Sequence, residues 1–258
     1  MSRTDDLARI LKKLRLSGVL VTLDLRVRQL TEENLDTEEF LYRLLNDEAE
    51  RREAKQLELR VRRAAFEQVQ TLETFDFQFN PQIPRARIID LAAGHYLDRR
   101  EPICLIGPTG VGKSHIAEAF GHRACRDGHS VLFVQASQML TELRAARADN
   151  SLAKRMLRFT SPKLLILDDL GLRPLRYEEP EDLYEVLRQR HQRGSTIITS
   201  NRSVEEWAPL FGDRLLAAAA LDRLLQDAHV IEMVGESYRT SLRAKANRSR
   251  TNALPAPL

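Results

Sequence analysis

The chain of 258 residues contains little cysteine and no side-chain arrangement typical of a metal or covalent-catalysis centre. Its two cysteines, Cys104 and Cys125, lie beside an apolar strand and helix, so we expect two buried thiols rather than a disulfide. Its six histidines are scattered without metal-ligand spacing. No Ser-His-Asp or Cys-His arrangement is recognisable. The sequence therefore argues against a disulfide scaffold, a histidine metal centre and a triad hydrolase.

Long apolar runs and a strong net charge are also absent. No stretch reaches the roughly 20 apolar residues needed to cross a bilayer, and the first residues are too charged for a signal-peptide core. We therefore expect a cytoplasmic protein. With 43% hydrophobic residues and a net charge of +3, the chain can form one core of ordinary size plus a smaller appendage. This charge permits nucleic acid as a partner without requiring it.

The N-terminal quarter has helical periodicity. A first amphipathic helix is expected to stop near Gly18, and a second to run from about Val19 to Leu30. A long helix is predicted over residues 37–66, because this stretch lacks glycine and proline and follows a capping-box pair, Asp36 and Glu39. The second half of that helix is mostly charged. It is either a solvated face or a contact for nucleic acid or a neighbouring subunit.

The composition changes near Thr71. Residues 72–87 concentrate three phenylalanines and two prolines, which predicts an extended connector lying on a core. Beyond it, strands alternate with helices, and the strand sequences are ICLIG, VLFVQA, LLILDD, STIITSN and HVIEMV. This order predicts an α/β domain whose parallel sheet is covered by helices on both faces, preceded by a small all-α domain. We place the parts at 1–71, 72–240 and 241–258, the last being a basic tail expected to be flexible.

A glycine-rich turn, GPTGVGKSH, connects the first of these strands to a helix. It matches the pattern G-x-x-x-x-G-K-[ST] in the strand-to-helix context that the motif requires. Backbone N–H groups of such a turn surround a phosphate chain, the lysine reaches the β and γ phosphates, and the serine coordinates Mg²⁺. The residues predicted to bind the nucleotide are Gly107, Pro108, Thr109, Gly110, Val111, Gly112, Lys113, Ser114 and His115.

A pair of aspartates follows the apolar strand residues Leu164–Leu167. At the carboxyl end of this strand, Asp168 would hold Mg²⁺ together with Ser114, and Asp169 would orient or deprotonate the attacking water. Alone, such a pair is often a turn or a helix cap. Its position after the phosphate loop favours the catalytic interpretation.

A third strand ends in Thr199, Ser200 and Asn201. An amide or hydroxyl at this place can hydrogen-bond the attacking water or the γ phosphate, which makes Asn201 a candidate catalytic sensor. Without the two preceding motifs it would be interpreted as a turn residue.

The order of GPTGVGKS, LLILDDLG, STIITSN, ALDRLL and GESYR resembles the AAA+ ATPases of the helicase-loader group, most closely the IstB-like helper ATPases of insertion-sequence transposition. The match extends from KLRLSGVLVTL through LETFDF to GESYR, nearly the whole chain. It implies a bacterial AAA+ P-loop ATPase that uses ATP and Mg²⁺ and forms a homo-oligomer on double-stranded DNA. It also implies that the protein selects a target and recruits or stimulates a cognate transposase, with hydrolysis controlling disassembly. The helical domain at 1–71 would then bind DNA or a partner.

The same resemblance suggests roles for two arginines. Arg223 stands where AAA+ proteins carry an arginine finger that reaches the ATP of the next subunit; the alternative is a helix-surface ion pair with Asp222 or Asp227. Arg239 resembles a sensor arginine that acts on its own subunit's nucleotide, the alternative being structural pairing with Glu236.

Asp169 departs from the family pattern. AAA+ enzymes usually carry glutamate there, and aspartate is one methylene shorter and less able to reach a water. The resemblance therefore implies slow hydrolysis, as in a switch rather than a motor.

Two basic segments are candidates for DNA contact. The insert at residues 140–159 would face the central channel of an assembly, by the same resemblance, and contact phosphates without reading bases; the alternative is an ordinary solvated helix face. The tail beyond residue 240 either touches phosphates or only adds solubility. The residues proposed to bind DNA in the insert are Arg144, Arg147, Lys154 and Arg155.

Two other functions share parts of this pattern. A DnaC-like replicative helicase loader would have a nearly identical ATPase core and would bind a helicase instead of a transposase. A small-molecule P-loop kinase would need an acceptor pocket and a closing lid within one subunit, and its activity would not depend on DNA.

Overall fold

The computed structural model describes residues 3–238 and 240–241. The chain divides into two compact units between Leu59 and Arg60. The predicted boundaries at residues 71 and 240 remain predictions. Arg239 and the tail beyond residue 241 lie outside the described residues. None of the described helices combines the length and apolar character that crossing a lipid bilayer requires.

The first unit, up to Leu59, is built from helices. Leu11, Val19 and Leu44 form its small buried core, and each comes from a different helix. Arg26 of the second helix and Asp47 of the third form an ion pair of 2.6 Å. The helices are α1 Arg3–Lys13, α2 Ser17–Glu32 and α3 Thr37–Ala64, whose last residues belong to the second unit.

Two predicted helix ends need correction. Gly18 does not end the first helix: it is the second residue of α2, and its backbone N–H donates to Glu48 Oε2 at 2.5 Å. The long helix α3 ends at Ala64 rather than Phe66, because Ala65 has a left-handed backbone (φ 57°). At the start of α3, Asp36 Oδ1 accepts from the backbone N–H of Glu39 at 2.8 Å, as predicted.

The second unit contains a five-stranded sheet in which every strand pair is parallel, in the order β2-β3-β4-β1-β5. The predicted parallel sheet is thereby confirmed. Because the strands are parallel, their carboxyl ends meet at one edge and their amino ends at the other. The strands are β1 Ile103–Ile106, β2 Val131–Gln135, β3 Leu164–Leu170, β4 Ser195–Ser200 and β5 His229–Glu232.

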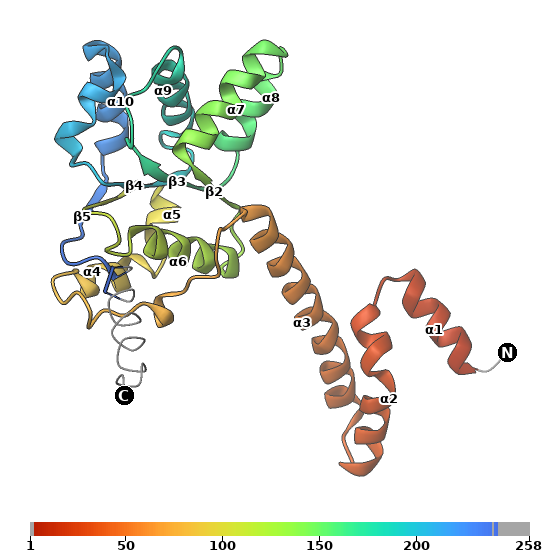
Figure 1. Ribbon diagram of the computed structural model, residues 1–258. Helices are drawn as coiled ribbons and strands as arrows, with labels where there is room; N and C mark the ends of the chain where they lie inside the picture. The colour runs from red at the N-terminus through yellow and green to blue at the C-terminus, as the bar shows by residue number, and fades with distance from the viewer. Residues whose placement is uncertain (1–2, 239, 242–258) are drawn as a thin grey trace, which may run out of the picture. The chain divides into compact units, whose positions relative to one another are not determined.

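Helices cover both faces of this sheet (Figure 1), which also agrees with the prediction. One layer consists of α4 to α6 and the other of α7 to α10. The helices are α4 Arg85–Leu91, α5 His95–Arg99, α6 Lys113–Arg126, α7 Ala136–Ala148, α8 Leu152–Thr160, α9 Glu179–Arg190 and α10 Arg214–Leu225. Short 3₁₀ turns cover Leu72–Thr74, Val204–Glu206 and Ala208–Phe211.

Residues 103–106, 131–134, 164–167 and 195–200 of the first four strands are buried, as expected for a parallel sheet between helix layers, whereas in the edge strand β5 only Ile231 is buried. Cys104 in β1 and Cys125 in α6 belong to this interior as free thiols, which confirms the prediction. Burial raises the pKa of Cys104 to about 12 and that of Cys125 to about 11. Neither thiol is therefore a reactive thiolate near neutral pH.

Candidate functional site

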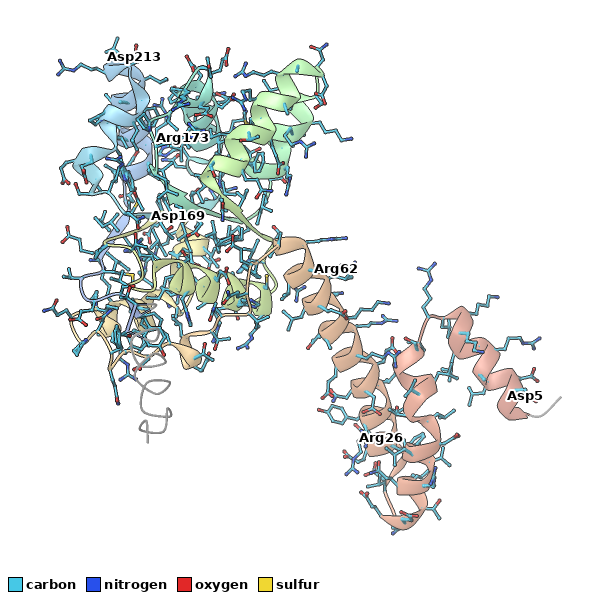
Figure 2. All side chains as sticks on the ribbon, in the orientation of Figure 1. Asp5, Arg26, Arg62, Asp169, Arg173 and Asp213 are labelled. Atoms are coloured by element: carbon cyan, nitrogen blue, oxygen red, sulfur yellow. The ribbon has the colours of Figure 1, made fainter. Side chains whose placement is uncertain are left out.

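Three predicted motifs meet at the carboxyl edge of the sheet, because β3, β4 and β1 are adjacent in the strand order. The phosphate loop leaves β1 after Ile106, and α6 begins at Lys113. Asp168 and Asp169 lie near the end of β3, and Asn201 directly follows β4. Figure 2 shows Asp169 at the level of the sheet, between the two helix layers.

Lys113 is held by acceptors from two of these elements. Its Nζ donates to the carbonyl oxygens of Gly107 and Pro108, each at 2.8 Å. It also donates to Asn201 Oδ1 at 2.6 Å. The predicted phosphate-binding lysine and the predicted sensor are thus in direct contact, a link that sequence spacing alone could not reveal.

Asp168 accepts hydrogen bonds at both carboxylate oxygens. Ser114 Oγ donates to Oδ2 at 3.0 Å, and Thr199 Oγ1 donates to Oδ1 at 2.5 Å. Asp168 is only 4% exposed, and this burial raises its pKa, while the two hydroxyl donors act in the opposite direction. The two predicted metal ligands are therefore side by side, and the Thr199 hydroxyl orients the carboxylate.

Asp169 lies at an irregularity in the sheet. The register between β3 and β4 shifts between Leu167 and Leu170, and Asp169 has a left-handed backbone with φ 56°. Its backbone N–H donates to Thr199 Oγ1 at 2.9 Å. A bulge of this kind redirects a side chain. The strand runs one residue past the predicted LLILDD segment, to Leu170, and Asp169 lines the cavity described next.

A cavity of about 580 Å³ opens beside the phosphate loop, a size suited to a small-molecule ligand. Residues 109–115, Asp169 and Asn201 line it, whereas Gly107 and Pro108 do not. The remaining lining residues that the sequence did not assign to the site include Glu118, Phe75, Phe79, Asn80 and Tyr238. The clustered phenylalanines had indicated only a connector, because no spacing rule relates that segment to the phosphate loop.

His115 holds that connector. Its Nε2 lies 2.9 Å from the carbonyl oxygen of Thr71 and 3.4 Å from Thr74 Oγ1. The Phe75 ring meets the His115 ring edge-on, with centroids 5.1 Å apart. His115 therefore lines the cavity and also fixes the chain that forms part of the cavity wall, while its nucleotide contact remains a prediction.

Glu118 is a buried carboxyl on α6, one turn beyond Ser114. Its Oε2 accepts from the backbone N–H of Gln68 at 3.3 Å. Burial, with smaller contributions from Glu67 and Asp168, raises its pKa to about 7. Glu118 is therefore partly protonated near neutral pH.

Arg223 lies away from this cavity. It is in the last turn of α10, which leads into β5 at His229, the amino end of the strand. Its Nη1 donates to the carbonyl oxygen of Ala219 at 2.7 Å, and its guanidinium lies 5.5 Å from the centre of the Tyr184 ring. Within residues 3–238, no ion pair joins it to the neighbouring aspartates considered above. Arg223 is therefore at the edge of the sheet opposite to Lys113.

The basic insert forms α7 and α8, and its predicted DNA contacts divide into two groups. Arg147 bonds the buried Asp182 at 2.5 Å, and Arg155 pairs with Glu142 at 3.3 Å. Arg144 and Lys154 are exposed and form no ion pair within the described chain. Contact with phosphates would therefore break an ion pair at Arg147 and at Arg155, but not at Arg144 or Lys154.

The residues of the cavity suit a magnesium nucleotide. No group of three or more His, Cys, Asp or Glu among the described residues could hold a metal ion alone. Ser114 and Asp168 nevertheless form the hydroxyl and carboxylate pair that Mg²⁺ uses together with substrate phosphates. Gly112 has φ 100°, and a Cβ there would lie 2.5 Å from Phe75 Cε2. A side chain at this position would therefore fill the space between the phosphate loop and the connector.

Comparison with known proteins identifies the family of this chain. A family model for IstB-like ATP binding proteins matches residues 9–246. An ATP-binding protein of an insertion sequence of Mycobacterium tuberculosis is 44% identical over 230 residues, 89% of this chain and 92% of that protein. The ATP-binding protein of insertion sequence IS21 of Pseudomonas aeruginosa is 35% identical over 246 residues, 95% of this chain and 93% of that protein.

Solved structures show the same fold at low identity. DnaI has a TM-score of 0.57 at 22% identity, over 64% of this chain and 92% of that chain. The DnaC helicase loader has a TM-score of 0.51 at 21% identity, over 58% and 87%. AMPPCP-bound DnaA from Aquifex aeolicus has a TM-score of 0.55 at 17% identity, over 72% and 56%. The chain therefore has the AAA+ fold of these structures and belongs to the IstB-like ATP-binding proteins, a family associated with insertion sequences.

Proposed function

We propose that this protein is a slow ATPase that assembles as a homo-oligomer on double-stranded DNA. In that form it selects the target and recruits or stimulates the transposase of its insertion sequence, and hydrolysis controls disassembly. The observation that carries the ATPase proposal is the contact of Lys113 with Asn201 and of Ser114 with Asp168 beside one cavity. The insertion-sequence names of the relatives support the role in transposition.

The phosphate loop and Lys113 would hold the triphosphate. Lys113 brings a positive charge to the first residue of α6, where backbone N–H groups also favour an anion. Its three oxygen acceptors fix the ammonium group in place. Phosphate oxygens would replace some of these acceptors, and Asn201 would then be released to contact the γ phosphate or the attacking water.

Ser114 and Asp168 would hold Mg²⁺, with Thr199 keeping the carboxylate in position. The metal ion, when bound, would neutralise charge on the phosphate oxygens. Asp169 would orient the attacking water or accept its proton. Its side chain is shorter than the glutamate usual in AAA+ enzymes, which supports slow turnover.

Arg223 would complete the site of a second molecule. A cis role at the cavity of its own chain is disfavoured by its position at the amino edge of the sheet. In a neighbouring copy the guanidinium would stabilise charge on the transferring phosphoryl group, worth about 10³ to 10⁵ in rate in finger-dependent enzymes. The sensor role of Arg239 remains a prediction from the sequence.

Arg144 and Lys154 would supply the DNA contacts of the insert, since they are exposed. Arg147 and Arg155 would contribute only after leaving their acidic partners. Contacts of this kind to phosphates are salt-dependent and blind to sequence. Repeated in every copy of an assembly, two contacts each would sum to a large electrostatic attraction.

The test is sedimentation velocity of the protein with and without Mg-ATP and a duplex DNA, together with Lys113→Ala. We expect wild-type protein to form a larger species only when both ligands are present, and Lys113→Ala to stay small. Lys163→Ala, which changes a lysine just before the amino end of β3, is the matched control. A wild-type protein that stays monomeric under all conditions would contradict the assembly. In a separate pull-down with this protein as bait, binding of a replicative helicase and not of the transposase would favour the loader function.

A further inference from the structure

Two segments distant in sequence form part of the cavity wall. Residues 74–80 of the connector contribute Thr74, Phe75, Asp76, Phe79 and Asn80, and the segment after β5 contributes Tyr238. None of the connector residues, nor Tyr238, was predicted to bind the nucleotide; in the second segment only the neighbouring Arg239 was predicted to do so. Both segments therefore line the same cavity as the phosphate loop.

The Asn80 side chain joins the two segments. It is 6% exposed, and its amide forms a pair of hydrogen bonds with the backbone of one residue, Glu236. Asn80 Nδ2 donates to the Glu236 carbonyl oxygen at 3.1 Å, and the Glu236 N–H donates to Asn80 Oδ1 at 3.1 Å. The side chain thus pairs with the backbone as a neighbouring strand would. A Cβ at Gly235 would lie 2.4 Å from Asn80 Oδ1, so the approach is close.

The segment that Asn80 holds is bonded directly to the phosphate loop. The Met233 N–H donates to the carbonyl oxygen of Ile106 at 2.7 Å, and the Tyr238 N–H donates to the carbonyl oxygen of Gly110 at 3.0 Å. The Tyr238 ring also meets the Phe79 ring at 87°, with centroids 5.0 Å apart. Residues 233–238 are therefore bonded to the β1 end and the phosphate loop on one side and packed against the connector on the other. The Asn80 side chain supplies the hydrogen bonds between this segment and the connector.

We propose that Asn80 is a positioning residue for the nucleotide: by binding the backbone of Glu236 it fixes Tyr238 and Phe79 against the phosphate loop and so keeps the cavity in its binding shape. This inference rests on the proposed nucleotide site. Asn80 itself needs no contact with the reacting phosphate. Its loss should therefore weaken binding of ADP and ATP alike and leave the chemical step unchanged.

The test measures the Kd of Mg-ADP, and the KM and kcat for ATP, in Asn80→Ala and Asn80→Asp. The alanine removes both hydrogen bonds. The aspartate keeps the shape but places an acceptor against the Glu236 carbonyl oxygen. We expect Kd and KM to rise about tenfold in both variants, with kcat within about twofold of wild type, since one to two hydrogen bonds are lost. Gln78→Ala, an exposed connector residue outside the cavity, is the matched control and should match wild type.

Thermal unfolding without nucleotide and hydrogen exchange of the Glu236 and Tyr238 amides accompany the titration. Faster exchange at these two amides, with a cooperative unfolding transition still present, is the expected result. Wild-type Kd in folded variants would overturn the inference, and so would loss of the cooperative transition in both variants, because Asn80 would then serve folding. Absence of nucleotide binding by the wild-type protein would instead contradict the proposed function.

Discussion

The two edges of the sheet differ in how many contacts hold their predicted functional side chains. At the carboxyl edge, Lys113 and Asp168 are each held by several partners around one cavity. At the amino edge, the Arg223 guanidinium donates to the Ala219 carbonyl oxygen and lies over the Tyr184 ring, and among the described residues it forms no ion pair. The first edge brings the predicted phosphate-binding and metal-binding residues together within one chain. The second carries a cation whose proposed use requires another molecule.

This difference separates binding from turnover. Side chains at the carboxyl edge should determine the nucleotide affinity and the activation of the attacking water. A side chain at the amino edge should affect the rate of ATP hydrolysis only within an assembly.

Replacing Arg223 with alanine should lower ATP turnover on duplex DNA about 10³-fold, because the phosphoryl charge of the neighbouring copy loses its counter-charge. The Kd for Mg-ATP should stay within about twofold of wild type, since Arg223 does not line the cavity. Equilibrium titration and steady-state hydrolysis measure the two quantities. An equal loss in affinity and rate would place Arg223 on its own chain's nucleotide and remove the contrast between the edges.

Asp169→Ala should keep ATP binding and lower turnover by about 10² or more, because only the activation of water is lost. The assembly on DNA should then persist. Single-turnover hydrolysis and the lifetime of the DNA-bound species measure these effects. Normal turnover by this variant would show that another group activates the water.

Glu118→Gln tests the carboxyl edge through pH. The pKa of Glu118 is about 7 in the folded protein, above the ordinary 4.5, so the folded state binds this proton more tightly. The resulting stability is present below pH 4.5 and is lost as pH rises through about 7. Between pH 5 and pH 8, wild type should therefore lose up to about 3 kcal/mol of unfolding free energy relative to the variant. Urea unfolding across this pH range measures the difference. If the unfolding free energies of wild type and variant changed with pH in parallel, the raised pKa of Glu118 would be contradicted.

The smallest effects should separate the arginines of the insert. Arg144→Ala should weaken duplex binding a few-fold and reduce its salt dependence by about one phosphate contact. Arg147→Ala should instead lower stability by about 1–3 kcal/mol, because Asp182 is 1% exposed and would lose its partner. Salt-dependent binding and urea unfolding of both variants distinguish these outcomes. Equal effects on DNA binding would show that the Arg147 ion pair opens.

The sequence predicted most of the fold and the meeting of three motifs at the carboxyl edge of the sheet. The phosphate loop and the aspartate pair carry local signals, because each motif needs fixed residue types at a fixed spacing after a strand. The strand ends could be placed beside one another because parallel strands share an edge. The shift that turns Asp169 toward the cavity has no such signal, since a bulge depends on pairing with β4.

Long-range contacts of single side chains could not be predicted. Asn80 and Glu236 are 156 positions apart, and no spacing rule connects them. Arg147 looked like one of four similar basic residues, yet its partner Asp182 lies 35 positions away on α9. Gly18 looked like a helix stop, whereas its backbone N–H is bound by Glu48 of α3. Each of these depends on packing between elements rather than on local pattern.

The most direct test of the difference between the edges mixes two inactive variants. Lys113→Ala lacks the nucleotide site but keeps Arg223, and Arg223→Ala has the opposite defect. If a nucleotide bound at the carboxyl edge of one copy is completed by Arg223 of another, mixing the two in the presence of duplex DNA and Mg-ATP should restore part of the turnover that neither shows alone. A mixture with no more turnover than the sum of its components, although both variants enter one assembly, would contradict the account.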